Sequence, residues 1–380
     1  MNGSNDPNDP NDPNDPNDPN DPNDPNDPND SNDPNDPNDS NDPNDPNGSN
    51  DLQSRSMLKT LVLVAGLVAV LSSAVVSQQP PAATPTALPS PVPREPSWAF
   101  QVQAGSLPAE PATPHTVPGS KRQYTPAQID DLRNPPDWFP EDHPAPAARV
   151  VKGEGNLMAC GSCHLMNGEG HPESATVSGF TVDYFVQQMN DFRSGARKDF
   201  ANRMDLIAKA MTDQEIRDVA QYFASLKPRK FTTVREAATV PATFVGQGRM
   251  RFADPKGGTE PVGKRIITLP EDAERARRRD PNSGFIAYVP PGSIARGAAL
   301  AKGGAKTTNC TICHGEGLRG LGNVPRIAGL HPIYVARQLI HFKEGTRNGV
   351  DAALMKKTTA GLTDDDIIDL SAYVASLARP

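Results

Sequence analysis

The sequence predicts an all-α protein in which two helical domains of the same kind are joined by an irregular, partly β bridge and preceded by a disordered N-terminal extension. Three observations lead to this prediction. The chain from residue 147 onward repeats itself with helical periodicity. The segment between the two copies carries short β-like runs. Most of the first 146 residues are rich in proline and poor in apolar side chains, so they have little to bury.

Residues 1–56 are dominated by a three-residue repeat, NDP with two NDS variants. The repeat has no apolar side chain and has proline in nearly every unit, which predicts an extended, solvated tail. Residues 1–77 hold 15 Asp against Arg55 and Lys59, a charge of −13, while the whole chain carries −8. The other 303 residues therefore carry +5. This charge is too modest to predict strong electrostatic steering, and no basic patch interleaved with aromatic residues suggests nucleic-acid binding.

Residues 57–77 indicate a secretory signal peptide, because Met57 and Lys59 precede an apolar run that is followed by small residues. A membrane-spanning helix needs about 20 apolar residues, and this run reaches Val76 only by including two serines. We therefore expect an exported, soluble, periplasmic protein. The alternative is an uncleaved anchor over residues 57–76, which would associate the protein with a membrane.

A signal peptide normally opens a chain, so we also expect translation to start at Met57, with residues 1–56 a misassigned extension. N-terminal sequencing of the native protein tests this, and an NDP peptide would contradict it.

Residues 78–146 hold 17 prolines in 69 residues and show little periodicity, which indicates a Pro-rich linker. The linker nevertheless contains both tryptophans of the chain, Trp98 and Trp138. Because exposure of tryptophan to water is unfavourable, we expect both side chains to dock on the folded part. The alternative is a loose tether.

The pentad CGSCH at 160–164 returns as CTICH at 310–314, and YFVQQMNDFRSGAR from Tyr184 returns as YVARQLIHFKEGTR from Tyr334, both at an offset of 150. The segment MDLIAKAMTDQEI from Met204 matches MKKTTAGLTDDDI from Met355 at an offset of 151. This repeat predicts two domains of one fold, over residues 147–228 and 293–380.

Apolar residues in the last helix of the first copy recur at i, i+3, i+4 and i+7, namely Ile216, Val219, Ala220 and Phe223. Capping boxes are predicted at Thr212 with Glu215, and at Thr363 with Asp366 in the second copy. Residues 229–292 differ in character, because FTTVREAATV, KRIITL and GFIAYV are β-like runs separated by Pro and Gly. We expect this bridge to lie across both copies.

The spacing C-x-x-C-H points to haem c, because both thiols reach vinyl groups on one edge of a porphyrin and the following histidine lies beneath its iron. Structural zinc would require a second cysteine pair in each copy. A thioredoxin-like redox pair has no need of the histidine, and two disulfides each followed by histidine would be a coincidence. We therefore predict two covalently bound haem c groups, held by Cys160, Cys163, Cys310 and Cys313, with His164 and His314 as iron ligands.

The repeat also selects candidates for the second axial position of each iron. Met204 and Met355 stand at equivalent positions ahead of the last helix, and no other methionine is paired in this way. Met189 and Met211 correspond to leucines in the second copy, which favours core positions for both. Methionine is a soft donor that raises the reduction potential relative to a second histidine.

Three histidines have no histidine counterpart in the other copy, namely His171, His331 and His341. We expect surface positions or positions near the ligands for them. A histidine ligand on one haem remains an alternative.

From about Val150 to its end the chain resembles the class I cytochromes c, in the form in which two such domains are fused into one soluble dihaem protein. The motifs that carry the resemblance are the two pentads, NVPRIAGLHPIYVARQLIHFKEGTR, and the segments ending in MTDQEI and LTDDDI. It implies a small all-helical fold around each haem, a periplasmic location, and electron delivery from a dehydrogenase or quinol-oxidising complex towards a terminal oxidase.

The resemblance also implies that a proline carbonyl accepts the Nδ1–H of the ligand histidine, a role that falls to Pro325 for His314. The first copy has Ala175 at this position, and its backbone carbonyl can accept the same bond.

With both axial positions filled, we expect an electron carrier rather than an enzyme, without a small-molecule substrate. The main alternative is a dedicated cytochrome subunit of a periplasmic dehydrogenase, docked through the linker and the bridge. A dihaem peroxidase is less favoured, because one of its haems needs an open or displaceable sixth position. The chain shows no Gly-rich phosphate loop and no Ser/His/Asp arrangement that stands out.

Overall fold

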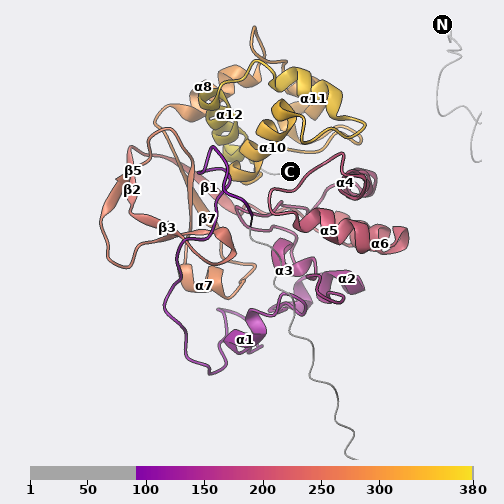
Figure 1. The fold of residues 1–380 in the computed structure, drawn as a ribbon, viewed down its shortest axis with the longest axis vertical. Coiled ribbons are helices and arrows are strands. Elements are labelled where there is room, and N and C mark those ends of the chain that lie inside the picture. Colours follow the sequence, from indigo (N-terminus) through magenta and orange to yellow (C-terminus); the bar gives the residue numbers. More distant parts are fainter. Residues whose placement is uncertain (1–90, 379–380) are drawn as a thin grey trace, which may run out of the picture. The chain divides into compact units, whose positions relative to one another are not determined.

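The structure, a computed structural model, describes residues 91–378. The predicted tail, the signal peptide and residues 78–90 of the predicted linker lie outside the described residues. Figure 1 shows the helices of the first copy and those of the second copy as two groups, with the strands of the intervening segment to one side of both.

Within residues 91–378 the helices are α1 (Pro126–Ile129), α2 (Ala148–Val151), α3 (Gly161–His164), α4 (Val182–Ser194), α5 (Arg203–Ala210), α6 (Asp213–Ser225), α7 (Ala273–Arg277), α8 (Ser293–Ala301), α9 (Thr311–His314), α10 (Pro332–Glu344), α11 (Ala352–Thr359) and α12 (Asp364–Ser376). The 3₁₀ helices are η1 (Pro140–Asp142), η2 (Gln247–Arg249) and η3 (Glu316–Leu318). The strands are β1 (Thr232–Glu236), β2 (Thr239–Pro241), β3 (Thr243–Val245), β4 (Arg251–Ala253), β5 (Thr259–Pro261), β6 (Ile267–Pro270) and β7 (Phe285–Val289).

The two copies have the same helix order. Helices of 4, 13, 8 and 13 residues follow one another as α3–α6 in the first copy and as α9–α12 in the second. Both predicted capping boxes are confirmed, at the start of α6 and of α12. The 13-residue helices α4 and α10 both end at a glycine with positive φ, a backbone conformation that side chains other than glycine rarely adopt. The two copies therefore share one local fold.

The copies differ in the helix ahead of the pentad. α2 has four residues, whereas α8 has nine and packs along α12. Gly297 permits this packing, because a Cβ there would lie 2.0 Å from the backbone oxygen of Asp369. The neighbouring Arg296 donates to the Asp369 carboxylate at 2.7 and 2.9 Å.

The segment between the copies contains all the strands of the described residues. β1 pairs parallel with β7, which pairs antiparallel with β6, while β2 pairs with β5 and β3 with β4. Along β7 the side chains of Phe285, Ala287 and Val289 are buried and the two between them are half-buried, the alternation expected for a strand. The segment contacts the first copy through Phe231 and Phe285, which pack with Leu165.

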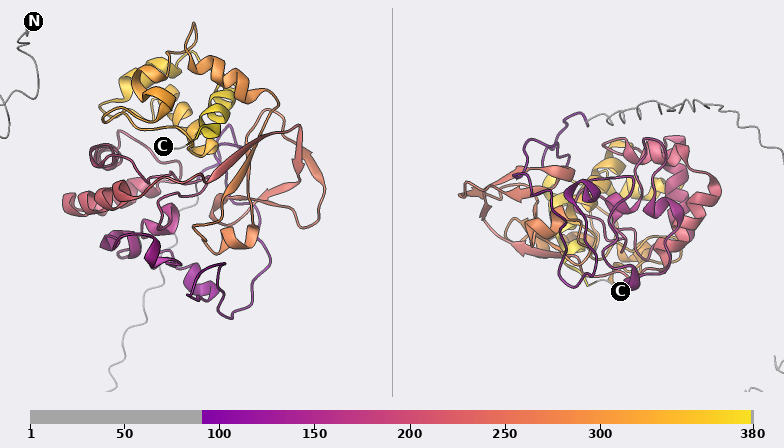
Figure 2. Two further views of the ribbon diagram at one scale, coloured as in Figure 1. Left: turned by 180° about the vertical axis from the view of Figure 1, so that it is seen from behind. Right: turned by 90° about the horizontal axis from the view of Figure 1, so that it is seen from below.

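Both tryptophans of the predicted linker are buried, which confirms the docking expected from the sequence and excludes a loose tether for residues 91–146. Trp98 is 9% exposed and packs in the apolar core of the second copy. Trp138 is 1% exposed, and its indole N–H donates to the backbone oxygen of Arg278 at 2.7 Å. Figure 2 shows from two further directions how residues 91–146 of the predicted linker run beside the strands and the first copy.

One histidine that was expected at the surface or near the ligands, His331, is instead buried where the second copy meets the bridge and the first copy. His331 is fully buried, with Nδ1 2.7 Å from the Thr232 hydroxyl and Nε2 3.0 Å from the backbone oxygen of Glu169. Nε2–H donates to this carbonyl, and because burial keeps the imidazole neutral, Nδ1 accepts from the hydroxyl. Burial lowers the pKa of His331 to about 3. Surface exposure is therefore wrong for this residue.

The linker docking predicts a large cost for removing Trp138. Trp138→Ala should lower the free energy of unfolding by about 3–5 kcal/mol, since it leaves a cavity and an unpaired carbonyl. Val92→Ala is the control, because Val92 is 79% exposed and such a change costs about 0.5 kcal/mol or less. Denaturant titration of both variants measures the difference, and equal effects would show that residues 91–146 add no stability.

His331 also predicts a loss of stability in acid. Below the usual histidine pKa of about 6.5 the unfolded chain binds a proton that the folded protein refuses until the pH approaches 3. The free energy of unfolding should therefore fall by up to ~1.4 kcal/mol per pH unit over this window on account of this residue. His331→Gln should flatten the decline, and an unchanged slope would show that His331 takes up its proton in the folded state.

Candidate haem sites

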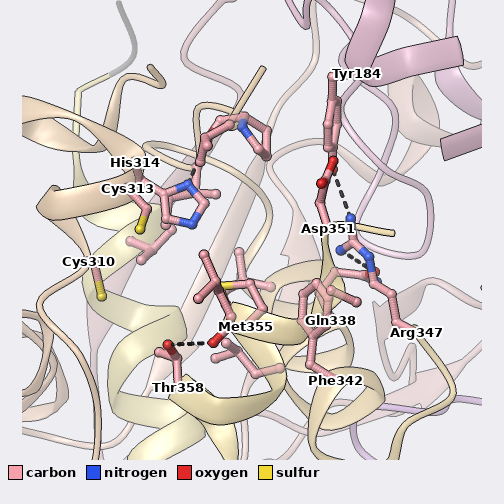
Figure 3. Close-up of a pocket in the computed structure, with 18 of the residues that line it drawn as sticks. Tyr184, Cys310, Cys313, His314, Gln338, Phe342, Arg347, Asp351, Met355 and Thr358 are labelled. Carbon is pink, nitrogen blue, oxygen red and sulfur yellow. Dashed lines mark hydrogen bonds between the residues drawn. The ribbon is translucent and has the colours of Figure 1, made fainter. Parts of the chain in front are cut away.

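The predicted ligands of the second copy line one cavity of about 610 Å³. Cys310 precedes α9, which supplies Cys313 and His314, the loop after it supplies Pro325, and α11 supplies Met355. Figure 3 shows His314 and Met355 pointing into the same space from different segments, with the two cysteines beside the histidine. We call this cavity the second pocket.

The corresponding residues of the first copy also share a cavity, which we call the first pocket. Cys160, Cys163 and His164 line it together with Ala175 and Met204. Its volume is about 150 Å³. The long side chains of Arg203 and Arg249 are among those that line it. No disulfide joins any two of the four cysteines.

Each predicted histidine ligand is oriented by a backbone carbonyl. Nδ1–H of His314 donates to the oxygen of Pro325 at 2.7 Å, which is the bond expected from the resemblance. Nδ1–H of His164 donates to the oxygen of Ala175 at the same distance, so the bond does not require proline. Burial lowers the pKa of both histidines. Each ring is then neutral, and its Nε2 lone pair is available to a metal.

The donor set in each pocket fits haem c, because two thiols, a neutral imidazole and a thioether meet around one space. Two buried polar atoms, one in each pocket, also support a bound haem. The NH1 group of Arg249 lines the first pocket without a hydrogen-bond partner, and the hydroxyl of Thr307 does so in the second. Buried polar groups rarely lack partners, and the propionates of a bound haem would supply anionic acceptors.

The two pockets differ in charge. The cations of the first pocket outnumber its carboxylates, with Arg197, Lys198, Arg203, Arg249 and Arg337 against Glu173 and Asp199. Arg337 is paired with Glu173. The second pocket is balanced, with Arg326 and Arg347 against Asp191 and Asp351. Excess positive charge favours the reduced state of an iron centre. A haem in the first pocket should therefore have a higher reduction potential than a haem in the second.

The pockets adjoin through a reciprocal network between the copies. Arg197 of the first copy donates to Tyr334 at 3.2 Å and to Gln338 at 2.9 Å. Arg347 of the second copy donates to Tyr184 at 2.9 Å (Figure 3). It also donates to Gln188 at 2.8 Å. Each arginine also lies over the phenylalanine five residues before it, with the guanidinium carbon 4.4 Å from the ring centre. As a result, Tyr184 lines the second pocket and Tyr334 lines the first.

This network was not predicted from the sequence, although the sequence contains a signal for it. Tyr184, Gln188 and Arg197 recur as Tyr334, Gln338 and Arg347 at the same offset of 150. Residues that are identical in both copies but have no place in haem attachment were candidates for the contact between the copies. Arg249 had no such signal, because the segment that contains it has no counterpart in the repeat.

For the histidines without a counterpart in the other copy, the expectation was a surface position or a position near the ligands, and His341 agrees with the second of these. His341 is buried and lines the first pocket, where burial lowers its pKa to about 3. Its Nδ1 lies 3.0 Å from the hydroxyl of Thr346. His171 and His331 line neither pocket. Met189 and Met211 are buried, as expected for core residues.

Comparisons with known proteins agree with this geometry. The family model for cytochrome c matches residues 294–378. Cytochrome c4 of Pseudomonas aeruginosa is 26% identical over 233 residues, which cover 61% of this chain and 90% of that protein. Cytochrome c-554(548) of Halomonas halodenitrificans is 36% identical over 77 residues, or 20% of this chain and 93% of that protein. The thiosulfate dehydrogenase electron acceptor of Stutzerimonas stutzeri is 25% identical over 228 residues, or 58% of this chain and 80% of that protein.

The charge of the first pocket predicts the effect of Arg249→Gln. Removing this cation should lower one of the two reduction potentials by on the order of tens of millivolts, because a buried charge close to the iron acts in a low dielectric. Arg265→Gln is the control, since Arg265 pairs with Glu260 and lines neither pocket. A spectroelectrochemical titration measures both potentials. Two unchanged potentials in Arg249→Gln would contradict the charge assignment.

Proposed function

Because this chain belongs to the cytochrome c family, we propose that residues 147–228 and 293–380 are two class I cytochrome c domains joined by the partly β bridge of residues 229–292. The observation that carries the proposal is the repetition of one donor set. In each copy two cysteines, a carbonyl-bound histidine and a methionine line one cavity.

The chain is a dihaem c-type cytochrome that transfers electrons. Each haem c is bound covalently and supplies an iron that changes between the ferric and ferrous states by one electron. In our proposal Cys160 and Cys163 hold the first group and Cys310 and Cys313 hold the second. His164 and His314 bind the irons through Nε2, because their Nδ1–H groups are already donated to carbonyls.

In this proposal Met204 and Met355 would supply the second protein ligand of each iron. Both lie on the eight-residue helix of their copy and line the pocket that also contains the histidine. A thioether ligand favours ferrous iron and leaves no position open to a substrate. This supports an electron carrier over a dihaem peroxidase. In the first pocket His341 is the competing donor, although its Nδ1 already lies near Thr346.

We propose a periplasmic location, on the basis of the signal peptide at residues 57–77 and of covalent haem attachment. Among residues 91–378 no helix combines the length and apolarity needed to cross a membrane. We further propose that a dehydrogenase or a quinol-oxidising complex donates electrons and that a terminal oxidase receives them. The relative from Stutzerimonas stutzeri is named as the electron acceptor of a dehydrogenase, which supports a donor of this class.

The ligand assignment predicts the outcome of Met355→Ala. The variant should keep two covalent haems by intact mass, because the cysteines are untouched. One haem should lose the methionine-to-iron band of its ferric spectrum, and its potential should fall by on the order of a hundred millivolts. Met250→Ala is the matched control, as it removes a methionine side chain that lines neither pocket and packs with Leu165, Phe231 and Phe285 instead. An unchanged spectrum in Met355→Ala would exclude this ligand.

A further inference from the structure

The edge at which haem would be tethered is covered in one copy and open in the other. The two residues between the cysteines are buried in the first copy, where Ser162 is 0% exposed. At the same repeat positions in the second copy both residues are exposed, and Ile312 is 65% exposed. Thioether bonds hold one porphyrin edge at the cysteine sulfurs, so the chain beside those cysteines decides whether that edge approaches the surface.

The loop that follows each pentad shows the same contrast. Residues 168–170, 172 and 173 of the first copy are buried, while residues 319 and 321–323 of the second are exposed, with Leu321 at 61%. Because the fold of the two copies is the same, the difference comes from what is packed against them.

The predicted linker and the bridge cover the first copy. Arg279 of the bridge donates to the backbone oxygen of Ser162 at 2.5 Å, and Asn167 donates to that of Pro281 at 2.7 Å. From the linker, the backbone oxygen of Leu132 accepts from the N–H of Ala159 at 2.9 Å. The chain's own segments thus occupy the face through which another protein would approach the first pocket.

The corresponding surface of the second copy is apolar and open. Of the five large apolar side chains that are exposed among the described residues, four belong to this copy, namely Ile312, Leu321, Val350 and Leu354. Val350 and Leu354 line the second pocket, Ile312 lies between its two cysteines, and Leu321 is bridged to Val324, which also lines it. We call these four residues the second-haem face.

The charge beside this face is predominantly positive. The basic side chains in and beside the segments that carry the face outnumber the acidic ones, with Lys302, Lys306, Arg319, Lys356 and Lys357 against Glu316, Asp351 and Asp366. Asp366 is ion-paired with Lys306 at 2.8 Å, which leaves four basic side chains against two acidic ones. Lys302 and Lys306 flank the turn before Cys310, where the N–H of Gly304 donates to the backbone oxygen of Thr307. An apolar centre with a basic border fits a protein surface that has an apolar centre and a carboxylate border.

We propose that this protein exchanges electrons with other proteins only at the second haem, through the second-haem face, and that the partner is an acidic redox protein. This rests on the proposed function. One electron passes from the reduced partner, which is oxidised, to the iron held by His314, which goes from ferric to ferrous, and the return step is the reverse. The first haem exchanges electrons only with the second, across the Arg197 and Arg347 network.

The test compares matched charge reversals in the mature protein with both haems. Lys357→Glu alters the basic border of the second-haem face, and Lys209→Glu makes the same change at an exposed position on the matching helix of the first copy. Stopped-flow oxidation of the fully reduced protein by ferricyanide, an anion, should slow roughly 3- to 10-fold at low salt in Lys357→Glu. Lys209→Glu should match the wild type.

A second readout does not depend on electron transfer. Carbodiimide cross-linking to an acidic blue-copper protein, followed by peptide mass mapping, should join its carboxylates to Lys302, Lys356 or Lys357 and leave Lys209 unmodified. Ile312→Asp should reduce the cross-linked yield. Cross-links at Lys209, or equal slowing by both charge reversals, would overturn the proposal.

Other outcomes separate the remaining explanations. If Ile312→Asp converts a dimer to a monomer in light scattering, the face belongs to a second copy of this chain and the proposal is wrong. If the wild-type protein fails to react with ferricyanide at all, the proposed function itself fails. If it reacts normally while the variants show no contrast, only the inference about the second-haem face fails.

Discussion

The arrangement of both pockets depends on one hydrogen bond that occurs in each copy, from the histidine of the pentad to a backbone carbonyl 11 residues later. The bond fixes the tautomer, so that Nε2 rather than Nδ1 faces the cavity. Burial keeps the ring neutral, which preserves the lone pair that a metal requires. In the proposed sites the pentad would attach the haem, and the carbonyl orients the histidine so that its Nε2 faces the cavity.

The pentad with its histidine–carbonyl bond occurs in both copies, but the linker and the bridge give the two pockets different surroundings. The reciprocal contacts of Arg197 and Arg347 bring the pockets together, since each arginine reaches residues that line the other copy's cavity. The linker and the bridge act on the first copy, where they bury the residues between the cysteines and add Arg249 to the pocket. An almost symmetric core thus gains an enclosed, cation-rich centre and an exposed, charge-balanced one. For a carrier of electrons, such inequality gives direction to charge movement within the molecule.

The sequence could predict the parts of the site that depend on short motifs or on positions that recur in both copies. The pentads, the capping boxes at Thr212 and Thr363, and the carbonyl partner of His314 all follow from short segments. The methionines on α5 and α11 were selected because they recur at matching positions, and each lines the expected cavity. What escaped prediction depends on contacts between distant segments. The burial of His331 and the placement of Arg249 require the packed fold, which no local pattern encodes.

The central claim is that both irons are closed on both faces by protein ligands. Electron paramagnetic resonance of the fully oxidised protein tests it most directly, because it counts ferric centres by spin state. Two low-spin ferric haems per chain are expected, with no high-spin signal. A high-spin ferric haem present in proportion to the protein would show an open axial position, and the protein would then have to be considered as a possible site of bond chemistry rather than as a carrier alone.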